Sequence, residues 1–302
     1  MNDELAHLQP AFRPHALLPT IERLQRLSQD RWINYTRADF ILTRLRSLLG
    51  YPERSRMPCL LLFGATGMGK TLIVEKFIRD HAAHFDEATR STRQPVAYVQ
   101  MPPSPGEKDF YEELLGTLGS ILPSGVSVTS LRHRARVMAR QVELRMLVID
   151  EIHSMLAGTF REQRIFLNAL RFLANDLRIP LVCLGTHEAK QALMTDQQLA
   201  DRFEAFELTA WTDDASFAQL LISFASILPL RKPSELCQSK IRKRILSLTE
   251  GVMVRICRLL EAAASEAIQS GRECIEADLL TDALAAHALV SISERRARRA
   301  TA

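Results

Sequence analysis

The sequence predicts an α/β fold: a parallel β-sheet sandwiched by helices, followed by a small all-helical domain. Short apolar runs of strand length alternate with segments whose apolar residues recur at helical spacing. This alternation is typical of a parallel sheet, in which crossover helices join the strands and cover both faces. After Trp211 the strand-like runs stop, and only helical patterns continue. The length of 302 residues suffices for one large domain or two unequal ones.

Five apolar runs are the candidate strands. The four clearest are residues 59–63, 96–99, 146–149 and 181–184, with a weaker fifth at 206–208. We expect four segments: an N-terminal helical extension (1–57), the sheet domain (58–211), a helical domain (212–290) and a basic tail (291–302). Within the extension, Ile21, Leu24 and Leu27 fit one face of a helix.

Composition narrows the functional classes only a little. The net charge of +4 is mildly basic and does not by itself indicate nucleic-acid binding. The five cysteines form no C-x-x-C pair, so we expect neither a disulfide framework nor a zinc site. The N-terminus lacks the apolar core of a signal peptide, and the longest apolar runs are too short to cross a bilayer. We therefore expect a cytoplasmic protein with no membrane partner.

A glycine-rich turn joins the first predicted strand to a helix. The string Gly64-Ala-Thr-Gly-Met-Gly-Lys70-Thr71 matches G-x-x-x-x-G-K-[ST] at every fixed position. Its glycines let backbone N–H groups point at phosphate oxygens, and the helix N-terminus adds favourable partial charge. We predict an ATP site in which Lys70 bridges the β- and γ-phosphates and Thr71 binds Mg²⁺. The predicted nucleotide contacts are Gly64, Ala65, Thr66, Gly67, Met68, Gly69, Lys70, Thr71 and Leu72.

A second motif supplies carboxylates. The apolar run 147–149 ends in Asp150 and Glu151, the arrangement of a Walker B strand. We predict that Asp150 holds Mg²⁺ and that Glu151 orients and deprotonates the attacking water. A glutamate at this position favours hydrolysis over binding alone. His153 completes the string Asp-Glu-Ile-His, but no other helicase motif is evident, so we assign it no role.

Three further polar residues are candidates for the γ-phosphate. Thr186 follows the fourth apolar run, where a strand tip would sense the water or phosphate. Arg202, just before the fifth run, would act on the site of a neighbouring subunit and stabilise transition-state charge in trans, which requires a ring or filament. Arg255, near the start of a helix in the C-terminal domain, would reach across to the same phosphate.

These strings carry a family resemblance. The chain resembles the AAA+ transposition ATPases of the TniB/TnsC type, most closely TniB, over roughly residues 20–290. Besides the P-loop, the resemblance rests on Arg31-Trp-Ile33 with Tyr35 and Ala38, Arg56-Met-Pro58, Leu-Gly-Thr186, Asp201-Arg202-Phe203, and Thr249-Glu-Gly251 with Arg255. One departure is Ala65, where many relatives have an acidic or polar residue.

The resemblance implies a regulator of DNA transposition. Members of this family bind ATP, oligomerise as rings or filaments on double-stranded DNA, and mark a target for a DDE-type transposase. They also receive a TniQ-type target selector, and hydrolysis resets the complex. Two alternatives remain open: a helicase-loader or replication-helper ATPase, and an ATP-dependent signalling scaffold that does not bind DNA.

The DNA-contacting residues are predicted from spacing and from the family. Arg132, Arg136 and Arg140 recur every four residues on one face of a predicted helix, where they could follow phosphates without reading sequence. Similarity to the family points instead to the segments that follow the second strand and precede this helix, and there to Lys108 and Ser127. Trp32 and Tyr35 would pack near the adenine or join the core, and we favour the core.

Overall fold

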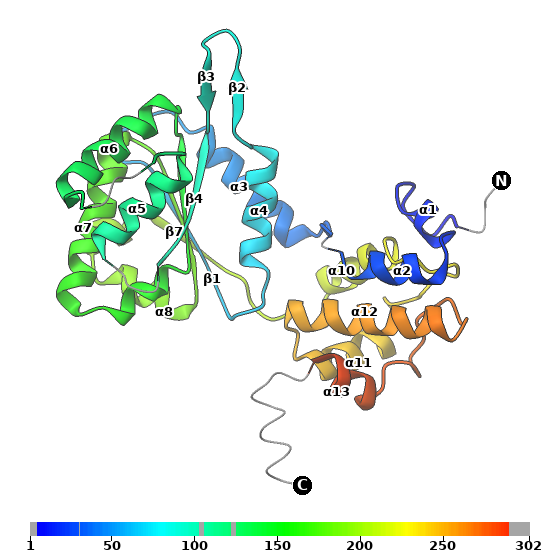
Figure 1. The fold of residues 1–302 in the computed structure, drawn as a ribbon. Helices are drawn as coiled ribbons and strands as arrows, with labels where there is room; N and C mark the ends of the chain where they lie inside the picture. Colours follow the sequence, from blue (N-terminus) through cyan, green and yellow to red (C-terminus); the bar gives the residue numbers. More distant parts are fainter. Residues whose placement is uncertain (1–4, 30, 103–105, 122–124, 290–302) are drawn as a thin grey trace. The chain divides into compact units, whose positions relative to one another are not determined.

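The computed structural model describes residues 5–29, 31–102, 106–121 and 125–289 (Figure 1). It divides into two compact units. The sheet unit is Phe40–Thr209, and the helical unit combines the described parts of Met1–Asp39 and Ala210–Ala302. The predicted basic tail lies outside the described residues.

This division differs from the expected one at the N-terminus. Residues 1–57 were expected to form one extension, but residues up to Asp39 belong to the helical unit and the rest to the sheet unit. Side-chain packing explains the difference. The Tyr35 ring packs edge-on against Trp211 at 5.6 Å between ring centroids, within the helical unit. The Phe40 ring stacks on Phe206 at 5.3 Å, within the sheet unit.

The sheet unit contains a five-stranded parallel sheet in the order β4-β5-β6-β1-β7. Its strands are β1 (Cys59–Phe63), β4 (Val96–Gln100), β5 (Met146–Asp150), β6 (Leu181–Gly185) and β7 (Phe203–Glu207). Every residue of β1, β5 and β6 is buried, as their apolar runs predict for central strands. The edge strand β7 is half exposed; it begins three residues before its predicted apolar run and ends one residue before the end of that run.

Helices cover both faces of this sheet (Figure 1). They are α3 (Thr36–Leu49), α4 (Lys70–Asp80), α5 (Glu107–Thr117), α6 (Val128–Gln141), the 3₁₀ helix η1 (Ile152–Ala157), α7 (Phe160–Leu177), α8 (His187–Met194) and α9 (Gln197–Ala200). One core cluster joins alternate strand residues, such as Leu61, Ile149 and Cys183, to α5, α6, α7 and α8. In Figure 1, α3 and α4 lie on the opposite side of the sheet from α5, α6 and α7.

A two-stranded hairpin between α4 and β4 was not predicted. It consists of β2 (His84–Asp86) paired antiparallel with β3 (Ser91–Arg93). Neither strand carries a buried residue. A hairpin without an apolar face has no hydrophobic alternation, and the sequence pattern could not reveal it.

The helical unit is all-helical in its described residues. It contains α1 (Arg13–Ala16), α2 (Thr20–Leu27), α10 (Ala215–Ala225), α11 (Ser239–Thr249), α12 (Met253–Gln269) and α13 (Asp282–Leu289), with the first residues of α3. The long helix α12 is the core element: Ile256, Leu259, Leu260 and Ala263 are fully buried. In Figure 1 it lies between α2 and α10 on one side and α11 and α13 on the other.

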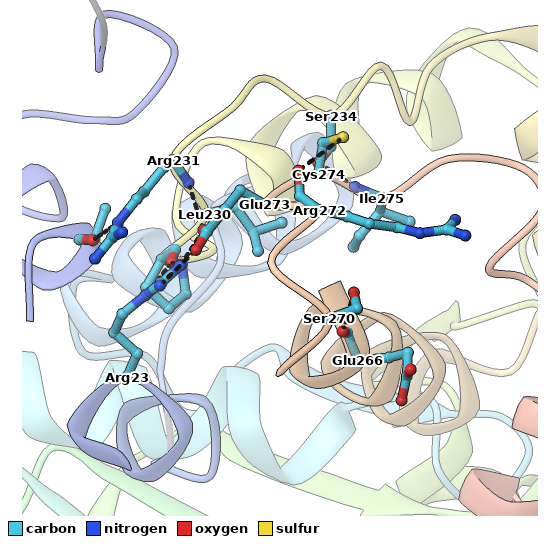
Figure 2. Close-up of polar contacts among 12 residues, drawn as sticks. Arg23, Leu230, Arg231, Ser234, Glu266, Ser270, Arg272, Glu273, Cys274 and Ile275 are labelled. Atoms are coloured by element: carbon cyan, nitrogen blue, oxygen red, sulfur yellow. Dashed lines mark hydrogen bonds and ion pairs between the residues drawn. The ribbon is translucent and has the colours of Figure 1, made fainter. Parts of the chain in front are cut away.

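The buried face of α2 is not the predicted one. Ile21 is 71% exposed and Leu24 is partly exposed, whereas Arg23 and Leu27 are buried. The Arg23 guanidinium binds the Glu273 carboxylate with Nη1 and Nη2, and Nε and Nη2 donate to Pro229 O at 3.0 and 2.7 Å (Figure 2). The Arg231 backbone N–H also donates to Glu273, at 3.2 Å. Arg23 can therefore occupy a core position, because its charge and its hydrogen-bond donors are satisfied by Glu273 and Pro229, which are distant in the sequence.

Candidate nucleotide site

The P-loop leaves the carboxyl end of the buried strand β1. Gly64, Gly67 and Gly69 have φ angles of 147°, 80° and 89°, in the region that favours glycine. At Gly64 a side chain is also excluded by space, because an added Cβ would lie 2.4 Å from Leu208 O. Gly69 caps α4, so that Lys70 and Thr71 open the helix. The predicted strand, loop and helix context of the motif is therefore present.

Lys70 is buried within this loop, with 7% of its surface exposed. Its Nζ donates to Gly64 O and Ala65 O, both at 2.9 Å. Burial lowers the pKa of the ammonium, and the nearby Glu151 and Asp150 carboxylates partly oppose that shift. A buried cation whose hydrogen-bond partners are neutral carbonyls is favourably placed to receive an anion such as a phosphate.

Thr71 and Asp150 meet at the carboxyl ends of the strands. The Thr71 hydroxyl donates to Asp150 Oδ2 at 2.7 Å, and the Tyr98 hydroxyl donates to the same oxygen at 2.9 Å. Burial raises the pKa of the Tyr98 phenol and Asp150 raises it further, so the phenol stays protonated and keeps donating. The hydroxyl and carboxylate predicted to share a metal ion are thus in direct contact, and hard oxygen donors of this kind suit Mg²⁺.

Glu151 follows Asp150 in an unusual backbone conformation. Its φ and ψ angles are 53° and 37°, in the left-handed region that costs non-glycine residues about 1–3 kcal/mol. Its backbone N–H donates to Asp150 Oδ1 at 2.7 Å. The His153 Nε2 atom lies 3.2 Å from Glu151 Oε2. Five other described non-glycine residues share this conformation, so it sets the direction of the Glu151 side chain without marking a functional site by itself.

Thr186 lies at the tip of β6, the strand between β5 and β1. Its hydroxyl donates to Glu188 Oε2 at 3.2 Å. The preceding residue, Gly185, accepts the Gly64 N–H at 3.2 Å. Thr186 is therefore next to a residue that contacts the P-loop, between that loop and the acidic pair, as a sensor of the γ-phosphate requires.

Arg202 lies at the opposite end of the sheet from the P-loop. Its carbonyl accepts the N–H of Cys59, the first residue of β1, whereas the P-loop follows the last. The five-residue strand between them spans about 13 Å. Arg202 Nη1 donates to Asn175 Oδ1 at 2.6 Å, and its buried Nε has no hydrogen-bond acceptor among the described residues. This position separates Arg202 from the P-loop of its own chain.

Arg255 belongs to the helical unit, in the first turn of α12. Its Nη1 binds Glu250 Oε2 at 2.5 Å. Gly251, between them, has a φ of 69°, and a Cβ there would lie 2.3 Å from Trp211 O. The reach of Arg255 to the nucleotide stays a prediction. Within the same unit Tyr35 is buried in the core, as expected, and the partly exposed Trp32 stacks on it.

The predicted arginine row on α6 binds carboxylates of this chain. Arg132 donates through Nε and Nη2 to Glu107 of α5, at 3.1 and 2.6 Å. Arg136 forms a two-pronged pair with Asp176 of α7, at 2.7 and 2.5 Å, and Arg140 joins it at 2.6 Å. Hydrogen bonds from Arg136 hold the pKa of Asp176 below its usual range, with help from Arg140. These arginines join α6 to its neighbours, so a DNA phosphate would have to compete with built-in partners.

The other two predicted DNA-contacting residues lie at the N-terminal ends of helices. Lys108 is in the first turn of α5, half exposed, 3.6 Å from the Glu112 carboxylate. Ser127 caps α6 by accepting the Ser130 N–H at 3.2 Å. Pro105, part of the segment singled out by similarity, lies outside the described residues.

Sequence reasoning missed Tyr98. No sequence motif includes a residue of β4, because this strand has no signature of its own. The signal was topological: β4 neighbours β5, with Gln100 opposite Asp150 in the register. A tyrosine two residues before the end of the neighbouring strand was therefore a candidate for contact with the Walker B aspartate.

Several solved structures share the fold of this chain. The chain resembles Cdc6p from Pyrobaculum aerophilum, with a TM-score of 0.62 and 18% identity over 90% of this chain and 73% of that one. The Aeropyrum pernix ORC2 protein, solved in ADPNP–ADP complexes, gives 0.58 and 14% over 89% and 73%. The ORC1 protein of the same organism, in complex with DNA, gives 0.52 and 18% over 93% and 69%. The fold is that of the AAA+ ATPases.

The family is more specific than the fold. Residues 23–213, more than half of the chain, match the family model described as "Bacterial TniB protein". The chain belongs to the TniB family, and the expected resemblance is confirmed. No curated protein sequence matches it. Among the described residues, no helix is long and apolar enough to cross a membrane.

Proposed function

We propose that this chain binds ATP and hydrolyses it to ADP and phosphate, slowly and in step with assembly. One observation carries the proposal: Lys70 and Thr71, after β1, and Asp150 and Glu151, at the end of β5, meet at the carboxyl edge of the sheet on either side of β6, in the context that phosphate binding requires. The loop glycines would aim N–H groups at phosphate oxygens, and Lys70 would bind the β- and γ-phosphates. Leu72 and the other loop residues would line the nucleotide.

The other residues of the site would bind the metal ion, activate the water and sense the γ-phosphate. Thr71 and Asp150 would hold Mg²⁺, which when bound would neutralise charge on the phosphate oxygens. Glu151 would accept the proton of the attacking water. Thr186 would orient that water or the γ-phosphate from the tip of β6. Arg255 would couple the helical unit to the nucleotide.

The position of Arg202 supports a role for oligomer assembly in ATP hydrolysis. Because a strand's length separates it from the P-loop of its own chain, we propose that it completes the site of a neighbouring subunit. Head-to-tail contacts of that kind build rings or filaments. Mixing Arg202→Ala with Lys70→Ala subunits tests this arrangement. Partial recovery of ATP turnover in the mixture supports a residue acting in trans, whereas two inactive proteins that stay inactive together contradict it.

Membership of the TniB family supports the biological setting. We propose that the ATP-bound chain oligomerises on double-stranded DNA without strong sequence preference and recruits or activates a DDE-type transposase. A TniQ-type target selector would be a second partner, and hydrolysis would reset the complex. DNA contact at Lys108, Ser127, Arg132 and Arg136 stays a prediction, and Lys108 is the most accessible of the three basic side chains.

The test is ATP-dependent DNA binding across a salt series. Wild-type protein is titrated onto a duplex with a non-hydrolysable ATP analogue, with ADP and without nucleotide, and the complexes are imaged by electron microscopy. We expect rings or filaments with the ATP analogue only, and an affinity that falls linearly with salt on logarithmic axes. Lys70→Ala is the matched control, which should not assemble.

Other outcomes select the alternatives. Nucleotide binding without any DNA affinity at low salt contradicts the transposition proposal and supports a signalling scaffold. DNA binding with loading of a replicative helicase, and no response from a transposase, supports a replication helper.

A further inference from the structure

His153 lies against the predicted catalytic base. It is the second residue of η1, and its Nε2 atom is 3.2 Å from Glu151 Oε2. The imidazole is the more buried partner, with 22% of its side chain exposed against 42% for Glu151. The ring is therefore the fixed element of the pair, and the carboxylate is the accessible one.

The other edge of the ring faces β6. A Cβ built on Gly185 would lie 3.4 Å from His153 Nδ1 and 2.6 Å from the Ala189 Cβ. A glycine at this position therefore leaves room for both the ring and α8. Gly185 also accepts the N–H of Gly64 and precedes Thr186. The ring thus stands between Glu151 and the strand end that contacts the P-loop.

The hydrogen-bond partners of the His153 ring indicate which tautomer it adopts. A neutral imidazole has one N–H donor and one acceptor nitrogen. His153 Nδ1 is buried with no hydrogen-bond partner among the described residues. A buried N–H without an acceptor loses the hydrogen bond that it makes to water in the unfolded chain, which is unfavourable. The N–H therefore belongs on Nε2, where it faces the carboxylate, and Nδ1 is the acceptor.

We propose that His153 is a positioning residue for Glu151, a role that rests on the proposed ATPase function. The left-handed backbone of Glu151 aims its side chain but leaves the carboxylate accessible to solvent. A ring held against Gly185 brings Nε2 within 3.2 Å of Glu151 Oε2, close enough for an N–H there to restrain the carboxylate. Contacts of this kind are often long before the substrate binds and tighten in the reacting complex. His153 sets where the base stands, without touching ATP.

Three substitutions separate the donor from the ring. In His153→Gln the amide N–H lies near the position of Nε2. In His153→Asn the shorter amide reaches only the position of Nδ1, and His153→Ala has no hydrogen-bond donor. We expect His153→Ala and His153→Asn to lower kcat roughly 10- to 100-fold, as misplacement of a reacting group does. His153→Gln should restore most of the wild-type kcat. KM and calorimetric ATP affinity should change little in all three.

A double-mutant cycle tests whether His153 acts through Glu151. In a Glu151→Gln background, His153→Ala should cause no further loss of turnover, because groups that act as a unit are not additive. A separate readout needs no turnover: in ¹⁵N-labelled protein the His153 ring signals should report the Nε2–H tautomer, and should shift on Glu151→Ala.

The measurements distinguish failure of the positioning role from failure of the proposed ATPase function. An unchanged or raised kcat in His153→Ala, equal losses in the Gln and Asn variants, or additive losses in the cycle would each overturn the positioning role. Failure of the proposed function looks different. In that case wild-type protein does not hydrolyse ATP, or Glu151→Gln turns over normally, while the tautomer measurement still reports on the contact itself.

Discussion

In the sheet unit Lys70 is buried against backbone carbonyls, whereas in the helical unit Arg23 is buried against the Glu273 carboxylate. Both cations are nearly inaccessible, at 7% and 1% exposure. The lysine retains capacity for an anion and has a lowered pKa. The arginine has its charge matched by Glu273 and two further donations accepted by Pro229 O.

This difference distinguishes a cation that binds a ligand, Lys70, from a cation that stabilises the fold, Arg23. A buried cation whose hydrogen-bond acceptors are all neutral is costly in isolation, even with carboxylates nearby, and favours an incoming ion of opposite charge. A buried charge with a carboxylate partner has no such need, and removing either member leaves the other uncompensated. Lys70 should therefore be needed for function and nearly dispensable for folding, and Arg23 the reverse.

The largest expected effect on activity belongs to the acidic pair of the sheet unit. Glu151→Gln should lower the ATP turnover rate by about 100-fold or more while ATP affinity stays near wild type, because the amide cannot accept the proton. Steady-state kinetics and calorimetry measure the two. Glu143→Gln is the matched control, since Glu143 also has a left-handed backbone, with a φ of 54°, far from the motifs. A normal rate for Glu151→Gln would remove it from the mechanism.

Next comes the buried arginine of the helical unit. Arg23→Met should lower the free energy of unfolding by about 3–5 kcal/mol, because Glu273 is left as a buried charge without its partner. Both tryptophans of the chain, Trp32 and Trp211, lie in this unit, so their fluorescence in a urea titration reports its unfolding directly. The exposed pair Arg272–Asp278 gives the control: Arg272→Met should leave the curve almost unchanged. An equal loss in both variants contradicts the comparison.

The same pair predicts acid sensitivity. Burial raises the pKa of Glu273, but hydrogen bonds from Arg23 and the Arg231 N–H outweigh that effect and hold it below its usual 4.5. A carboxyl with a lowered pKa stabilises the fold fully above its unfolded value and loses that contribution as pH falls through its folded value. Urea titrations by tryptophan fluorescence should therefore show stability falling below about pH 4.5, with a shallower slope in Glu273→Gln.

The smallest effect is expected when both charges are removed together. Arg23→Met with Glu273→Leu should recover most of the stability lost by Arg23→Met alone, because apolar replacements of a buried pair are often neutral or better. A double variant as unstable as the single one would show that the Pro229 O contacts, and not the charge balance, carry the stability.

The fold was predicted well where the sequence signal is local. Three of the four clear apolar runs became fully buried strands, with ends within one residue of the structure, and the fourth, β4, is buried except at two positions. The edge strand β7 was misplaced because its half-exposed residues give a weak pattern. The buried face of α2 was wrong for a different reason. Arg23 is in the core only because Pro229 and Glu273, more than 200 residues away, satisfy it.

In the site, too, the residues that could be predicted are those with a local sequence signal. Gly64 to Thr71 could be recognised because consecutive residues fix both the loop and its chemistry. Tyr98 and His153 could not, since their contacts with Asp150 and Glu151 depend on strand order and on the path of η1. The arginine row on α6 was visible as a spacing, but not its pairing with Glu107 and Asp176.

The most direct test of this account compares ATP affinity with stability in a single variant, Lys70→Met. Calorimetric titration of wild-type protein with ATP and Mg²⁺ should give saturable 1:1 binding, and Lys70→Met should weaken it by at least about 100-fold, near 2.7 kcal/mol. Its urea unfolding should match or exceed wild type in the absence of nucleotide, because a desolvated charge has been removed. Lys76→Met, at a partly exposed lysine of the same helix that pairs with Asp80, is the control. Unchanged ATP affinity in folded Lys70→Met protein would contradict the central claim.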